Sequence, residues 1–208
     1  MTTLVLVAAS GLAGETAAAA AGYDQIVAVD DDRGRWGTVV GGAKVIGPVE
    51  VVADTGADLV ICTGSGRVRR MLVERLLDYG VTPDRFATII HPDASVAAGC
   101  EVGPGSILLA GVRLTSQVSV GRHVVVMPNA VFTHDDIVAD FATVCAGVAL
   151  GGGVVVGEAA YLGMSSSVRQ HVTIGADSVL GMGSVLLHDL PVGETWVGVP
   201  ARPVRVAV

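Results

Sequence analysis

The feature that most constrains this chain is a six-residue repeat that runs without insertion from Ile90 to Leu186. All seventeen residues at that spacing are large and apolar. A period of six fits neither a helix, whose faces recur every 3.6 residues, nor a strand, whose side chains alternate. It is the hexapeptide signature of a parallel β-helix, in which three successive repeats make one triangular coil. We therefore predict a solenoid whose interior is filled by this row.

Two further positions of the repeat are informative. The residue after the large apolar one is often glycine, as at Gly103, Gly121 and Gly157. We expect tight corners there, with backbone angles that glycine adopts easily. The residue four places after the large one is small or apolar, with one charged exception, Asp136. We expect Asp136 to point inward, where it either supports the adjacent His134 or is satisfied by backbone amides of the corner.

Residues 1–89 follow a different pattern. Buried strands are predicted at TLVLVAAS, QIVAVDDD and DLVICTGSG, with helices near residues 14–22 and at RVRRMLVERLLDYG, whose arginines form a solvated face. This alternation predicts a small parallel sheet, and ligands of such sheets bind beyond the carboxyl ends of the strands. The glycine motif of a dinucleotide-binding loop is incomplete here. Two interpretations therefore stay open: a site for a mononucleotide-sized ligand, and a plain strand–turn–helix. Six residues are expected to lie together at the carboxyl ends of these strands, a place called the rim below: Ser10, Gly11, Asp30, Asp31, Gly64 and Ser65.

Charge and composition exclude several classes of protein. A net charge of −7 argues against a partner that is a nucleic acid, which needs a basic face. The three cysteines form no C-x-x-C pair, which argues against a zinc ribbon and favours a reducing compartment. No run of about 18 apolar residues predicts a membrane span, and no basic residue precedes the first apolar run as in a signal peptide. We expect a cytoplasmic protein without a membrane partner.

The order of segments resembles a known family. A small α/β part, then IIHPDASVAAG, then hexapeptide coils, then VGVPARPV is similar to the sugar O-acyltransferases of the sialic acid O-acetyltransferase and bacillosamine N-acetyltransferase type. The resemblance implies a Rossmann-like nucleotide-sugar-binding domain at 1–89, a left-handed parallel β-helix at 90–188, and a tail at 189–208 that packs near the coenzyme site. It also implies acetyl-CoA as co-substrate, no metal, and a homotrimer with active sites between subunits.

The same resemblance assigns the site residues. In that family a histidine in a segment like AVFTHDD is the general base and the next acid orients it, which implies His134 and Asp135. On the coenzyme side it implies Gly152, Met164 and Met182, with Thr143 at the place of a second family histidine. On the sugar-nucleotide side it implies Ser10, Gly11, Asp30, Asp31 and Gly64, with Leu12 where the family has a histidine.

Spacing and chemistry support His134 independently. Residues three repeats apart should stack, so His134 is predicted to lie between Ser116 and Gly152, below a strip without side chains that would admit an extended ligand. A sugar amine must lose a proton before it attacks a thioester, and histidine changes charge near neutral pH. A neighbouring carboxylate fixes the tautomer of the imidazole. A lone histidine on a solenoid is usually inert, so the adjacent Asp135 matters to the interpretation.

These observations predict an acetyl-CoA-dependent N-acetyltransferase that acts on a nucleotide-linked amino sugar. O-acetylation of a sugar hydroxyl is an alternative that the same histidine would serve. A non-catalytic β-helix that binds a nucleotide sugar also remains, since Thr143 and the first loop depart from the family. A zinc carbonic anhydrase on this scaffold needs two histidines five residues apart, and none of the five histidines has that spacing. Of the others, His91 is expected to cap the linker, and His123 to be structural or exposed.

Overall fold

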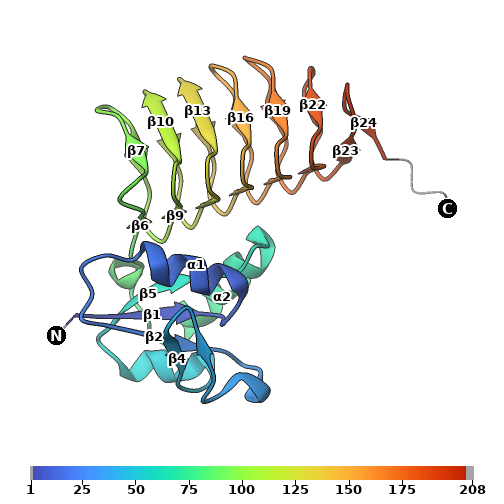
Figure 1. Cartoon of the computed structure of the whole chain (residues 1–208). Coiled ribbons are helices and arrows are strands. Elements are labelled where there is room, and N and C mark those ends of the chain that lie inside the picture. The colour runs from blue at the N-terminus through green and yellow to red at the C-terminus, as the bar shows by residue number, and fades with distance from the viewer. Residues whose placement is uncertain (1, 205–208) are drawn as a thin grey trace.

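The computed structural model describes residues 2–204, and these residues form an α/β part followed by a long solenoid (Figure 1). The first part is a five-stranded sheet with the order β3-β4-β2-β1-β5, mostly parallel, with one antiparallel hairpin between β3 and β4. Its strands are β1 (Thr3–Val7), β2 (Gln25–Val29), β3 (Val39–Val40), β4 (Ala43–Val45) and β5 (Asp58–Ile61). Its helices are α1 (Gly11–Ala19), α2 (Gly66–Asp78) and the 3-10 turns η1 (Arg33–Arg35), η2 (Val49–Asp54) and η3 (Pro83–Arg85).

The three strands expected from the sequence are all present, and the hairpin of β3 and β4 was not predicted. Helix α1 begins at Gly11, three residues before the expected start. The reason is Ser10, which holds an extended backbone at the N-cap position and lets the helix begin directly after the first strand. Within residues 2–204, neither helix is long and apolar enough to cross a bilayer.

The solenoid is a triangular prism whose three faces are parallel sheets, apart from the last pair, β23 and β24, which is antiparallel. Each face is named here after one of its strands. The β13 face holds β7 (Ser95–Val96), β10 (Arg113–Ser116), β13 (Val131–His134), β16 (Ala149–Leu150), β19 (Ser167–Val168) and β22 (Val185–Leu186). The β14 face holds β8 (Glu101–Val102), β11 (Ser119–Val120), β14 (Ile137–Val138), β17 (Val155–Val156) and β20 (Thr173–Ile174). The β9 face holds β6 (Ile89–Ile90), β9 (Ile107–Leu108), β12 (Val125–Val126), β15 (Thr143–Val144), β18 (Tyr161–Leu162), β21 (Val179–Leu180), β23 (Thr195–Val197) and β24 (Arg202–Pro203).

The six-residue row fills the prism as predicted. Each residue of the row pairs with the residue three repeats later, in the next coil, as Leu114 does with Phe132 and Phe132 with Leu150. Fourteen of the seventeen residues in the row are buried, and Val96 and Val102 are half-buried against the same core. Ile90 is the exception at 41 % exposed, because β6 is the first strand of its face and no earlier coil covers it.

The glycines at the corners serve a different purpose from the one expected. Positive φ angles occur two residues later in the repeat, at residues such as Gly105, His123 and Asp135. Gly103, Gly121 and Gly157 do not have positive φ angles, so the expectation of unusual backbone angles was wrong. A Cβ added at Gly157 would lie 2.5 Å from the backbone nitrogen of Ala176 in the next coil. Glycine is needed here because stacked coils approach too closely for a side chain.

The α/β part packs on the β9 face through a shared apolar core. Leu4 and Leu6 of the sheet belong to one buried cluster with Ile107 and Val125 of the solenoid. Helix α1 contributes Leu12 and neighbouring alanines to the same cluster. The burial of this surface, worth about 25 cal/mol per Å² of apolar area, fixes the α/β part against one face of the prism.

Arg69 of α2 supplies the polar part of this contact, which corrects the prediction of a solvated arginine face. Its side chain is fully buried, and its five hydrogen bonds go to acceptors of both parts. These acceptors are the carbonyls of Thr63 (2.7 Å), His123 (2.9 Å), Phe141 (2.7 Å) and Ala142 (2.8 Å), and the hydroxyl of Thr143 (2.9 Å). Burial lowers the pKa of Arg69 to about 10, so the guanidinium stays charged at neutral pH. Its fork of donors thus bonds to carbonyls of a solenoid corner and to Thr63 of the α/β part at the same time.

Replacement of Arg69 by Met should therefore destabilise the protein strongly. The methionine fills similar space but leaves several buried carbonyls without a donor, which costs on the order of 3–5 kcal/mol. Urea unfolding of the purified variant measures the loss. Arg70→Met is the matched control, because Arg70 lies at the surface in an ion pair with Glu158 and should have little effect on stability. Equal losses in the two variants would contradict a special role for Arg69.

Candidate active site

The predicted base lies on the corner that joins the β13 face to the β14 face. His134 is the last residue of β13, which has four residues where most strands of this face have two. Asp135 follows with a φ of 61°, which turns the chain at the corner. Nδ1 of His134 and Oδ2 of Asp135 are 2.7 Å apart, and both side chains are more than 60 % exposed. With Nδ1 donating to the carboxylate, Nε2 has a free lone pair to accept a proton.

The neighbours of His134 are those that the repeat predicted. Ser116 pairs with it from the coil below, and the imidazole lies directly against Gly152 in the coil above. A Cβ at Gly152 would be 2.4 Å from Nε2 of the ring, so the glycine makes room for the base. The predicted open strip is absent, because the His134 ring covers Gly152 and the His171 ring lies against Gly153.

Asp136 points into the prism, as predicted, and is fully buried. Oδ1 accepts a hydrogen bond from the backbone N–H of Val154 at 2.8 Å, and Oδ2 accepts one from that of Thr133 at 3.0 Å. Burial raises the pKa of Asp136 to about 6, although these two hydrogen bonds and the nearby His134 act to lower it. A buried carboxylate therefore lies next to the exposed His134–Asp135 pair.

The predicted sugar-nucleotide residues gather at the carboxyl ends of β1, β2 and β5. Ser10 Oγ donates to the Cys62 carbonyl at 2.6 Å, and Asp30 Oδ2 accepts from the Ala9 amide at 2.8 Å. Asp31 forms an ion pair with Arg75, whose hydrogen bond holds the pKa of this carboxyl below its usual range. Helices α1 and α2 both begin at this rim, and helix N-termini attract phosphates.

Leu12 does not fit a role for its side chain at this rim. It is 7 % exposed and belongs to the apolar cluster between the sheet and the solenoid. The sequence placed it in the first turn of α1 but gave no sign of which face of that turn meets the solenoid. Only the backbone N–H of Leu12, and not its side chain, lies at the N-terminus of α1.

Arg35 is a candidate that sequence reasoning missed. Its guanidinium donates to the carbonyl of Ala9 in the first loop and lies 3.9 Å from Asp30 and 3.7 Å from Asp32. It places a half-exposed cation beside the N-terminus of α1, which suits a phosphate group. The signal in the sequence was a cation shortly after the paired acids, on a turn too short to predict.

The predicted coenzyme residues fall on two separate corners. Met164 and Met182 are exposed and stack one coil apart on the corner between the β9 and β13 faces. Gly152 lies on the corner of His134. Thr143 is 1 % exposed, and its hydroxyl donates to the Gly64 carbonyl at 2.8 Å and accepts from Arg69. The Thr143 side chain thus faces the rim of its own chain, and the structure contradicts a coenzyme contact made by an accessible side chain there.

One chain does not bring the base and the rim together. The α/β part contacts the β9 face and its corner with the β14 face, through Arg69 and the apolar cluster. His134 lies on the third corner, which is opposite the β9 face. Figure 1 shows β13 ending at the edge of the solenoid that lies away from the α/β part.

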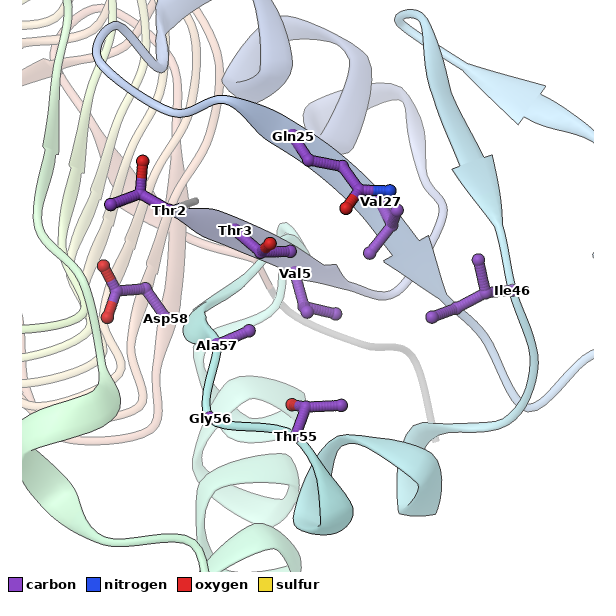
Figure 2. Close-up of a pocket in the computed structure, with 10 residues that line it drawn as sticks. All are labelled: Thr2, Thr3, Val5, Gln25, Val27, Ile46, Thr55, Gly56, Ala57 and Asp58. Carbon is purple, nitrogen blue, oxygen red and sulfur yellow. The ribbon is translucent and has the colours of Figure 1, made fainter.

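Two of the hollows beside the α/β part bear on the position of the rim. Figure 2 shows a cavity of about 590 Å³ at the amino ends of β1 and β2, lined by Thr3, Gln25 and Asp58 among others, and therefore distant from the rim. A second hollow of about 540 Å³ lies beside the rim, between the start of α2 and the β9 face, with Ser65 and Tyr161 in its lining. Within residues 2–204, no three His, Cys, Asp or Glu side chains are grouped closely enough to hold a metal ion.

Comparison with known proteins shows clear similarities. No family model matches the chain. It is 29 % identical over 150 residues to GDP-perosamine N-acetyltransferase of Escherichia coli O157:H7, an alignment that spans 70 % of this chain and 66 % of that protein. It is 30 % identical to PerB from Caulobacter crescentus, solved in complex with CoA and GDP-perosamine, with a TM-score of 0.89 over 99 % of this chain and 98 % of that one.

A second solved structure is equally similar. The acetyltransferase domain of PglB from Neisseria gonorrhoeae FA1090 is 29 % identical, with a TM-score of 0.89 over 98 % of this chain and 100 % of that one. This domain has also been solved in complex with acetyl coenzyme A. Two further structures of the Caulobacter enzyme carry one histidine replaced by asparagine or by alanine.

The buried carboxyl of Asp136 predicts how stability depends on pH. Its pKa is raised from 3.8 to about 6, so between these values the folded chain retains a proton that the unfolded chain has released. The resulting stabilisation is present near pH 4 and is lost by about pH 6, and it amounts to roughly 3 kcal/mol. The melting temperature of the wild type minus that of Asp136→Asn should therefore fall between pH 4 and pH 7. A difference that stays constant over this range would contradict the raised pKa.

Proposed function

The chain belongs to the hexapeptide-repeat sugar N-acyltransferases of the bacillosamine type, and we propose that it transfers an acetyl group from acetyl-CoA to the amino group of a nucleotide-linked amino sugar. The fold of this family is a Rossmann-like α/β domain followed by a left-handed parallel β-helix. The observation that carries the proposal is the hydrogen-bonded pair of His134 and Asp135 on a corner of that helix.

We assign the tasks to the segments expected from the sequence. Residues 1–89 hold the nucleotide sugar at the rim, and the coils of residues 90–188 carry out the transfer. The tail of residues 189–208 packs near the coenzyme, although residues 205–208 lie outside the described part of the chain. At the rim, the helix N-termini and Arg35 provide the donors for the phosphates of the nucleotide.

The mechanism is a direct transfer. The sugar amine attacks the carbonyl carbon of the thioester, and Nε2 of His134 accepts the proton that the nitrogen loses as the C–N bond forms. Asp135 holds Nδ1–H and stabilises the imidazolium. The C–S bond then breaks, and the CoA sulfur leaves as a thiolate that takes up a proton. General-base catalysis of this kind typically contributes about 10²–10⁴-fold to the rate.

We propose that acetyl-CoA lies along the outside of the solenoid, next to Gly152 and the exposed side chains of Met164 and Met182. Met164 and Met182 offer a stacked apolar surface for the pantetheine arm. Gly152 keeps the ring of His134 close to the coil, where a longer side chain would displace it. Thr143 acts indirectly, by tying β15 to Gly64 at the rim.

We propose that the working enzyme is a homotrimer with active sites between subunits. The rim and His134 lie on opposite sides of one prism, so a second copy must supply one of them. Exposed apolar residues on the solenoid, such as Ile137 (51 %) and Met182 (73 %), are consistent with a contact between copies. We place the protein in the cytoplasm, because its three cysteines are all free thiols and fit a reducing compartment.

Replacement of His134 by Asn should remove the base while retaining the shape of the corner. We expect kcat to fall by about 10²–10⁴-fold, with small changes in KM for both substrates. The assay measures CoA released from acetyl-CoA with a panel of nucleotide-linked amino sugars that includes GDP-perosamine. His91→Asn is the control, because His91 lies at the linker, where its Nδ1 accepts the Asp93 amide. A His134→Asn enzyme with unchanged kcat, or a wild type that releases no CoA with any acceptor, contradicts the proposal.

A further inference from the structure

Asp136 breaks the rule of the repeat at the corner that carries the proposed base. Its position in the six-residue pattern is occupied by Val118 in the coil below and by Val154 in the coil above, and both are buried. Asp136 is equally buried but carries a carboxylate with two hydrogen bonds. Burial of an ionised group is costly, so the chain would be expected to place valine here unless the carboxylate had a task.

One of the two hydrogen bonds changes how consecutive coils are connected. On the other two corners of the prism, the amide at this position can bond to the carbonyl three residues earlier, as Val148 does with Cys145 and Ala160 with Gly157. The amide of Val154 instead donates to Oδ1 of Asp136 at 2.8 Å, in the coil below. Asp136 therefore connects the corner of His134 to the corner of Gly152 and Gly153.

The other hydrogen bond reaches the strand that carries the proposed base. The backbone N–H of Thr133 donates to Oδ2 of Asp136 at 3.0 Å. The hydroxyl of the same Thr133 donates to the Leu150 carbonyl in the coil above at 3.1 Å. The residue just before His134 is therefore bonded both to Asp136 and to the next coil.

Together these bonds form a clamp around the catalytic pair. The carboxylate of Asp136 bonds to the backbone immediately before His134, so His134 and Asp135 lie in a loop closed by that bond. The same carboxylate anchors this loop to the coil against which the imidazole rests. The ring is therefore held from its own strand and from the coil above.

On the premise of the proposed function, we infer that Asp136 is a positioning residue that holds His134 and Asp135 where the acceptor amine meets the imidazole. It touches no substrate and acts through the backbone of Thr133 and Val154. A displacement of about 1 Å at a catalytic group can cost on the order of 10²-fold in rate.

The clamp should also depend on pH. Both oxygens act as acceptors, and a protonated carboxyl loses one of them. The titratable groups facing Asp136 are His134 and Asp135, and the apolar Val118 and Val154 lie on the coils to either side. Because the pKa of Asp136 is about 6, the wild type loses its clamp below this pH and comes to resemble an Asn variant. The ratio of the wild-type kcat to that of Asp136→Asn should therefore decrease as the pH falls from about 8 to about 5.

The test compares Asp136→Asn and Asp136→Val with a matched control, Ser106→Ala. Ser106 occupies the same position of the repeat on another corner, is buried, and accepts the Val124 amide of the next coil at 2.9 Å. We expect kcat to fall by about 10–100-fold in both Asp136 variants, with KM for both substrates within about twofold. Ser106→Ala should keep the wild-type kcat even where it loses melting temperature. An Asp136→Val enzyme whose kcat equals that of Ser106→Ala overturns the inference.

Hydrogen exchange separates this inference from the proposed function. Amide exchange in peptides that contain Thr133 and Val154 should be faster in the Asp136 variants than in the wild type and in Ser106→Ala. Unchanged exchange overturns the clamp, and faster exchange with unchanged kcat overturns its role in positioning. A wild type without acetyl transfer overturns the proposed function and the positioning role that rests on it, while the exchange data still show whether the clamp exists.

Discussion

The apolar row inside the prism is the constraint on which the rest of the structure depends. Every sixth residue fills the interior, so each coil stacks on the next in a register of three repeats. Glycines such as Gly157 permit the close approach of the coils, and the corners then present chosen residues to the outside. His134 and Asp135 are positioned by this register, and Asp136 departs from it by placing a carboxylate where the row has small or apolar residues.

The second determinant is the way in which the α/β part is fixed to one face. Apolar burial supplies the contact area, and Arg69 donates to carbonyls at one corner of the solenoid. This attachment places the rim next to the β9 face, while the proposed base, His134, lies on the opposite corner. The separation follows from the position of the docking face and gives a physical reason for a site built from two copies.

Much of this could be predicted from the sequence, because the repeat is local and regular. The interior row, the inward Asp136 and the neighbours of His134 follow from counting in sixes. The burial of Arg69, the inward side chain of Leu12 and the engagement of Thr143 could not be predicted, since each depends on contacts between distant segments. The glycine expectation was wrong because the distance between coils is a property of the assembled prism and cannot be read from one repeat.

The central claim is that His134 of one copy acts on a sugar held by another copy. Two defective chains test it: His134→Ala, and Gly64→Glu, which places a negative charge at the rim where the structure leaves open space. Each variant alone should be inactive. In the proposed trimer, a mixture of equal amounts should recover about a quarter of the wild-type activity, because half of the rims are intact and half of their neighbours carry an intact base. Mixed trimers that remain inactive would contradict the account and place the complete site within one chain.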